Sequence, residues 1–132
     1  MRVRRAVGND VGSIVAMWLR SRAESVPEIP APVHSDDEVL AWFEAVVLPE
    51  REVWVAEEAD TIAGLLVLDG EWIDQLYVAP GQTSRGVGSQ LMAIAKQQRP
   101  TALKLWTFTA NTGARRFYCR HGFTETGSTE GD

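Results

Sequence analysis

Residues 79–92 read APGQTSRGVGSQLM and lie between a strand-like run and a helix-like run. A glycine-rich turn that enters a helix leaves backbone N–H groups unpaired at the positive end of that helix, which favours an anion such as phosphate. Small residues also let a ligand approach the backbone closely. The stretch therefore indicates either an ordinary surface turn or a phosphate-binding backbone, and the flanking sequence must decide between them.

Two familiar phosphate-binding loops are excluded. No Gly-Lys-Ser or Gly-Lys-Thr is present, so the stretch is not a P-loop. Residues 86–91 (GVGSQL) lack the third glycine of the dinucleotide fingerprint, and no acidic residue closes a following strand at the expected distance.

The rest of the chain predicts a single α/β domain over residues 1–132. Apolar periodicity, caps and turn residues predict helices at 10–23, 35–49, 89–98 and 111–121, and strands at 2–6, 52–58, 61–69, 71–78, 102–109 and 122–127. This order, βααβββαβαβ, predicts a mixed sheet, antiparallel in the hairpins and parallel where a helix intervenes. Three prolines predict an irregular loop at 25–34.

Composition restricts the functional class. The net charge of −5 disfavours nucleic acid as a partner and suits a cationic acceptor. The longest apolar stretch is too short to span a bilayer, so no membrane role is expected. The single cysteine, Cys119, fits a reducing cytoplasm, and two histidines with one cysteine argue against a metal site.

Two motifs then identify a family. The run Leu76-Tyr77-Val78-Ala79-Pro80 with Thr83-Ser84-Arg85-Gly86-Val87-Gly88 resembles motif A of the GNAT superfamily of N-acetyltransferases. Downstream, Asn111-Thr112-Gly113-Ala114-Arg115-Arg116-Phe117-Tyr118-Cys119-Arg120-His121-Gly122-Phe123 is similar to the family's Asn-x-x-Ala-x-x-Phe-Tyr-x-x-x-Gly-Phe. The element order fits too, so the resemblance covers nearly the whole chain and implies the splayed central sheet of that fold.

The chain departs from the family pattern at two places. Thr83 stands where glutamine or arginine is usual, which removes one side-chain contact but leaves the backbone. The expected last strand, Phe123 to Thr126, has no following strand in this sequence. Three outcomes are open for that edge: solvation, a folded-back tail, or pairing with a second copy as a homodimer, which is favoured.

The resemblance implies acetyl-coenzyme A as the acyl donor. Backbone groups at Leu76 and Val78 would pair with the pantetheine amides, and one N–H would polarise the thioester carbonyl. Asn111 would contact the pantetheine arm, or would only cap a helix. The full set expected at the donor is Leu76, Tyr77, Val78, Thr83, Ser84, Arg85, Gly86, Val87, Gly88, Ser89, Asn111 and Tyr118.

The resemblance also implies the catalytic groups. Tyr118 is the candidate general acid that protonates the departing thiolate; the alternative is a core tyrosine. Asp74 is the candidate base, because strand alternation places it on one face with Trp72, Leu76 and Val78; the alternative is a salt-bridged aspartate. Trp72 is a candidate contact for the acceptor. His34 is a further candidate, although a plain surface role is favoured for it.

The expected function is transfer of acetyl from acetyl-coenzyme A to a primary amine by direct attack in a ternary complex. The alternative is a coenzyme A-binding sensor without catalysis, which Thr83 and the short C-terminal region favour slightly. Cys119 is expected to be structural, since no partner histidine is placed to activate it. The acceptor amine and the acyl length are not determined by these residues.

Overall fold

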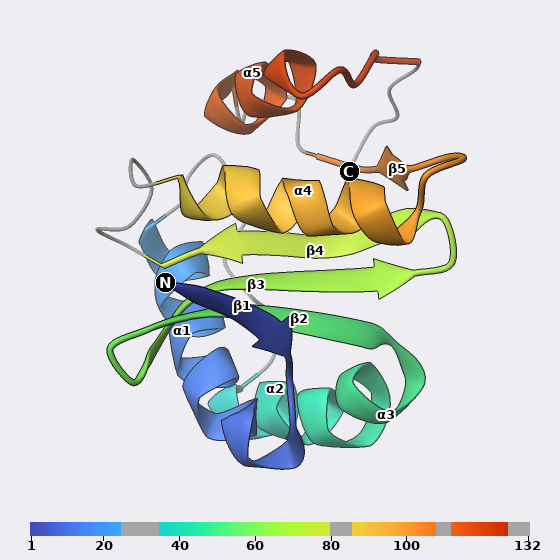
Figure 1. The fold of residues 1–132 in the computed structure, drawn as a ribbon. Coiled ribbons are helices and arrows are strands. Elements are labelled where there is room, and N and C mark those ends of the chain that lie inside the picture. Colours follow the sequence, from blue (N-terminus) through green and yellow to red (C-terminus); the bar gives the residue numbers. More distant parts are fainter. Residues whose placement is uncertain (25–34, 80–85, 108–111, 127–132) are drawn as a thin grey trace.

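A five-stranded mixed sheet lies between two layers of helices in the computed structural model (Figure 1). The structure describes residues 1–24, 35–79, 86–107 and 112–126. The strands are β1 (Arg2–Arg5), β2 (Glu52–Glu58), β3 (Thr61–Asp69), β4 (Trp72–Val78) and β5 (Lys104–Leu105), and they follow one another across the sheet in chain order. The first three pairs are antiparallel, whereas β4 and β5 are parallel, as the intervening helix predicts.

One helical layer covers the first face of the sheet. It holds α1 (Val11–Glu24) and a continuous helical run made of α2 (Asp36–Trp42), a π-helical segment η2 (Phe43–Val47) and α3 (Leu48–Glu50). A short 3-10 turn, η1 (Gly8–Asp10), precedes α1. A capping box opens α2: the Glu38 amide donates to Ser35 Oγ at 3.2 Å, and the Ser35 amide donates to Glu38 Oε1 at 3.0 Å.

The second layer, on the opposite face, holds α4 (Val87–Gln98) and α5 (Thr112–Arg120) (Figure 1). Gly64 of β3 allows α4 to lie against the sheet, because a Cβ there would stand 2.7 Å from Val87 Cγ1 and 2.8 Å from Leu91 Cδ1. Both of those side chains are fully buried. Glycine in this strand therefore marks a close approach between strand and helix.

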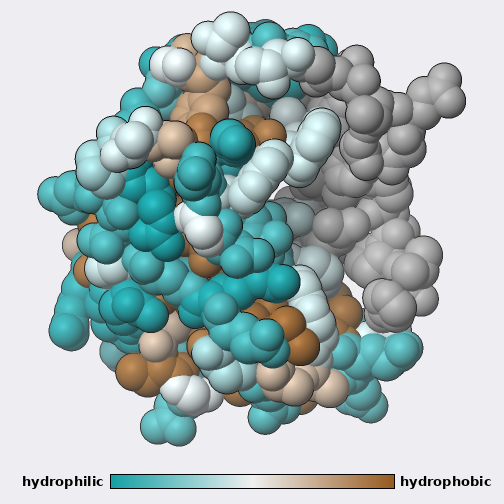
Figure 2. Space-filling model, turned by 90° about the vertical axis from the view of Figure 1, so that its right-hand side faces the viewer, coloured by the Kyte–Doolittle hydropathy of each residue, from teal (hydrophilic) through white to brown (hydrophobic). Residues whose placement is uncertain are grey.

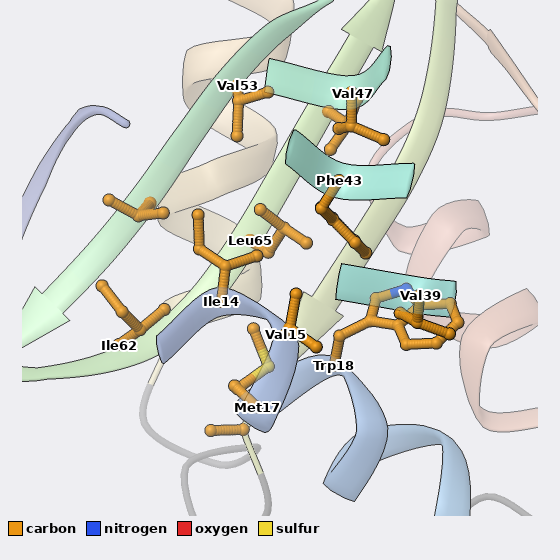
Figure 3. Close-up of a cluster of buried hydrophobic side chains, with 13 residues drawn as sticks. Ile14, Val15, Met17, Trp18, Val39, Phe43, Val47, Val53, Ile62 and Leu65 are labelled. Carbon is orange, nitrogen blue, oxygen red and sulfur yellow. The ribbon is translucent and has the colours of Figure 1, made fainter. Parts of the chain in front are cut away.

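Two clusters of buried apolar side chains fill the spaces on either side of the sheet. The first joins α1, α2 and η2 to β2 and β3, with Trp18 and Phe43 in edge-to-face contact at 5.8 Å (Figure 3). The second joins α4 to β3 and β4 and includes Leu66, Leu91 and Met92. β3 is buried along both faces because it contributes side chains to both clusters. Its sequence is therefore one continuous apolar run.

The C-terminal part differs from expectation. β5 is only two residues long, although a strand over 102–109 was predicted; residues 108 and 109 lie outside the described part. Residues 123–126 form no strand, so the predicted last strand and the sheet edge expected there for a homodimer are wrong for this segment. Phe123 is instead tied to α5, where its amide donates to the Tyr118 carbonyl at 3.0 Å and Gly122 takes a positive φ of 89°.

The face of the molecule shown in Figure 2 is mainly polar where its residues are described. Figure 2 views the end of the sheet where β3 turns into β4, and it shows hydrophilic residues with small, separate hydrophobic areas. Within the part of the chain that the structure describes, no helix has the length and apolar character needed to cross a membrane.

Candidate functional site

The outer edge of β4 is the first component of the site. β5 pairs with β4 only through Trp72 with Lys104 and Ile73 with Leu105. The Ala79 amide donates to the Ala63 carbonyl of β3 at 2.8 Å. Because backbone groups alternate along a strand, those of Leu76 and Val78 point away from β3 and toward the side that β5 leaves. The Val78 carbonyl accepts from Ser21 Oγ at 3.0 Å.

The N-terminus of α4 is the second component. Gly86 precedes this helix in the left-handed conformation, with φ 78° and ψ 9°, and a side chain there would meet open space. The amides of the first turn, from Val87 to Ser89, precede the regular hydrogen bonding of the helix, which begins with the Gln90 amide donating to the Gly86 carbonyl. A Cβ on Gly88 would lie 3.5 Å from Val78 Cγ2, so this turn begins beside the end of β4. Thr83, Ser84 and Arg85 lie outside the described residues.

Helix α5 is the third component and packs directly on the first turn of α4. A Cβ on Gly88 would stand 3.2 Å from the Phe117 ring, so the second glycine of the motif also serves the packing of α5. Phe117 lies against the rings of Tyr118 at 5.4 Å and His121 at 4.5 Å. Ser89 Oγ and His121 Nε2 are 3.2 Å apart, which links the two helices.

Tyr118 lies in the cluster beneath α4, together with Leu76 and Val78 of β4. Burial, with the electrostatic influence of Tyr77 added, raises the pKa of Tyr118 to about 12. Its phenol therefore stays protonated at every ordinary pH. A neutral phenol in the same cluster as Leu76 and Val78 can act as a proton donor and not as a base.

Asp74 occupies a β-bulge. Ile73 pairs with Leu68 and Gln75 pairs with Val67, so Asp74 is the extra residue between them. Beyond the bulge the strand alternates: Leu76 and Val78 pack in the cluster under α4, whereas Gln75 accepts a hydrogen bond from the Trp18 indole of α1. The face that Asp74 is expected to share with Leu76 and Val78 stays a prediction.

Arg51 is the partner of Asp74 that the sequence did not reveal. Its Nη1 lies 3.4 Å from Asp74 Oδ2, and its Nε lies 3.4 Å from Asp69 Oδ2. The guanidinium thus occupies one carboxylate oxygen of the candidate base, which was the alternative foreseen for Asp74. The two residues are 23 positions apart, and no local spacing indicated that they meet.

Trp72 stacks on Trp106, with ring centroids 5.9 Å apart and planes 9° apart. Both indoles are exposed, at 36% and 60%, where β4 and β5 begin to separate. Trp106 was not predicted as a site residue. Its position two residues after Lys104, the β5 partner of Trp72, was the signal that could have indicated it.

The remaining predicted residues fall outside the site or outside the described chain. His34 and Asn111 lie outside the described residues. Cys119 is exposed, so its expected structural role is wrong; the buried side of α5 carries Phe117 and Tyr118 instead. Among the residues that the structure describes, no group of three metal-ligating side chains is found.

Comparison with known proteins gives the family. The acetyltransferase (GNAT) domain family matches residues 49–125. The peptidyl-lysine N-acetyltransferase YjaB of Salmonella typhimurium is 30% identical over 132 residues, covering 98% of this chain and 88% of that protein. The peptidyl-lysine N-acetyltransferase YiaC of Escherichia coli is 29% identical over 122 residues, covering 92% of this chain and 82% of that protein.

Solved structures agree. The solution structure of apo YjaB from Escherichia coli has a TM-score of 0.75 at 28% identity, covering 99% of this chain and 87% of that one. The structure of AAC(6')-Iy in complex with the bisubstrate analogue CoA-S-monomethyl-acetylneamine has a TM-score of 0.74 at 18% identity, covering 97% of this chain and 93% of that one. The latter likeness concerns the fold alone. With a family match over more than half of its length, this chain belongs to the GNAT acetyltransferase family.

Proposed function

We propose that this protein transfers an acetyl group from acetyl-coenzyme A to a primary amine by direct attack in a ternary complex. The observation that carries the proposal is the meeting of two features: the outer edge of β4 beyond Ile73, where the described part of β5 no longer pairs with it, and the N-terminus of α4, where Gly86 faces open space. A strand edge supplies backbone groups for an amide-bearing ligand, and a helix N-terminus supplies N–H groups for phosphate. Acetyl-coenzyme A carries both kinds of group.

The donor residues divide between these two features. Backbone groups of Leu76 and Val78 would hold the pantetheine amides, with Tyr77 between them, and the amides from Thr83 to Ser89 would hold the pyrophosphate. Asn111 would contact the pantetheine arm. A thioester bound there would supply the activated acetyl group; the chain's own part is to bind, orient and move protons.

Tyr118 is proposed as the general acid. Its phenol is protonated, partly buried and in the same cluster as Leu76 and Val78, beside which the sulfur would lie. A positioned proton donor typically contributes about a hundredfold or more to such a step.

Asp74 is proposed as the base that prepares the incoming amine, with Arg51 holding its carboxylate in place. Glu71 is a weaker candidate for the same base. Trp72 is proposed to contact the acceptor, and His34 is a further candidate contact. Since two relatives are named peptidyl-lysine N-acetyltransferases, lysine-containing peptides are the first acceptors to assay.

The donor site is tested by replacing Gly86. Asparagine tolerates the left-handed conformation almost as well as aspartate and has the same shape, so it is the matched control for charge. We expect Gly86→Asp to weaken coenzyme A binding at least tenfold and Gly86→Asn to weaken it much less, as measured by isothermal titration. Equal affinities for both variants and the wild type would place the phosphate elsewhere.

Catalysis is tested by thiol release from acetyl-coenzyme A with a panel of amines. Amine-dependent release supports the transferase. Coenzyme A binding without release from any amine would favour the sensor module instead.

A further inference from the structure

A hydrogen bond joins the two helices that meet at the proposed phosphate site. Ser89 is in the first turn of α4, and its Oγ lies 3.2 Å from His121 Nε2 at the end of α5. The imidazole is also held by the Phe117 ring at 4.5 Å, and that ring in turn lies on Gly88. Packing thus places an imidazole beside the turn whose amides are proposed to bind pyrophosphate.

The surroundings of His121 are cationic. Lys96 of α4 donates from Nζ to the His121 carbonyl at 2.5 Å. Burial, then Lys96 and Arg120, lower the pKa of His121 below its ordinary value of 6.5. Among the described residues these are the charged groups that act on the imidazole. The free protein therefore holds His121 neutral at pH 7, next to the positive end of a helix.

An anion bound at this turn would raise the pKa of His121. A nearby negative charge favours the protonated form of a histidine, and it would offset the repulsion from Lys96 and Arg120. Ser89 keeps its contact in either state, because a protonated imidazole donates to the hydroxyl oxygen and a neutral one donates to it or accepts from it.

We propose, resting on the proposed function, that His121 held on Ser89 is a proton-dependent contact for the pyrophosphate of the donor, and that donor binding is accompanied by partial uptake of a proton from solvent at a pH between the free-state and bound-state pKa of His121. The bound-state pKa is then higher than the free-state pKa. The extra affinity is fully present below the free-state value and is lost as the pH rises through the bound-state value.

The pKa of His121 can be measured directly, because the chain has only two histidines. Imidazole proton–carbon NMR spectra are recorded from pH 5 to 8.5, and His121→Gln identifies the signal. The probe is 3'-dephospho-coenzyme A, since a phosphate monoester itself titrates near pH 6 and a pyrophosphate diester does not. We expect the pKa of His121 to rise by at least one unit on saturation. An unchanged pKa would overturn the proposal.

Binding supplies the second readout. For a one-unit rise, the Kd for 3'-dephospho-coenzyme A should fall about tenfold between pH 8 and pH 5. His121→Gln, which keeps a neutral hydrogen-bonding side chain, should match the wild type at pH 8 within about twofold but lose the pH dependence. Glu44→Gln, at an exposed position of the opposite helical layer, should keep the wild-type profile.

The outcomes separate this inference from the proposed function. If neither the wild type nor any variant binds the probe at any pH, the donor site itself is wrong. If the wild type binds and His121→Gln shows the same pH profile, the donor site stands and the role of His121 is wrong.

Discussion

Tyr118 shows at the residue scale how burial prepares a proton donor. Because its pKa is about 12, the phenol is fully protonated from pH 7 to pH 10. We expect Tyr118→Phe to lower kcat by about a hundredfold, with little change in coenzyme A affinity. The ratio of wild-type to variant kcat should stay constant over that pH range, since Tyr118 begins to lose its proton only near pH 11. A ratio near one would mean that water protonates the thiolate or that product release limits turnover.

Two substitutions distinguish a catalytic role of Asp74 from a structural role of its ion pair with Arg51. If Asp74 is the base, Asp74→Asn should reduce kcat most at neutral pH and less at high pH, where the free amine is already abundant. Arg51→Gln breaks the same ion pair but leaves the carboxylate, so it should keep most of the activity. Both variants should change stability by less than about 1 kcal/mol, because the pair is partly exposed and its two atoms are 3.4 Å apart. Equal losses of activity in the two variants would show that the pair only maintains structure.

At the scale of elements, Gly64 sets the distance between β3 and α4. A methyl group there would overlap the buried side chains of Val87 and Leu91, which would have to shift, and it would lie 3.3 Å from the Tyr77 carbonyl. We expect Gly64→Ala to lower the free energy of unfolding by about 1–3 kcal/mol, measured by urea denaturation.

Gly12→Ala is the matched control for that substitution. Gly12 lies in α1, and a Cβ there meets nothing within 4 Å. Alanine at an open helical position should raise the free energy of unfolding by about 0.5–1 kcal/mol. If both variants were destabilised alike, close packing at Gly64 would not be the cause.

At the scale of the whole molecule, charge favours a cationic acceptor. The net charge is −5. The carboxylates near the exposed Trp72 are paired, Asp69 and Asp74 with Arg51 and Glu71 with Lys104, so the net charge of the whole molecule carries this argument. Long-range attraction raises the association rate of a cationic peptide and is screened within about 10 Å at 0.1 M salt. We expect kcat/KM for a lysine peptide to fall about two- to fivefold between 20 and 300 mM salt. A flat or rising profile would argue against steering by this charge.

Local patterns predicted most of the fold. The apolar spacing in α1, the capping box at Ser35 and the β-branched runs of β2 and β3 all act over a few residues, so these elements were expected and are present. The sequence predicts that α4 begins at Ser89, whereas it begins two residues earlier, at Val87, directly after Gly86. Boundaries of this kind depend on backbone geometry more than on residue type.

The same distinction between local patterns and tertiary structure applies to the candidate site. Motif spacing alone was enough to indicate the family, the glycine turn before α4 and the candidates Tyr118 and Asp74, since each depends on neighbours in the chain. The bulge at Asp74, its ion pair with Arg51, the stacking of Trp72 on Trp106 and the contact of Ser89 with His121 required the tertiary structure. These contacts join residues that are 23 to 34 positions apart in the chain, such as Asp74 with Arg51 and Ser89 with His121. They form only when whole elements pack against one another. No local pattern of residues therefore specifies them.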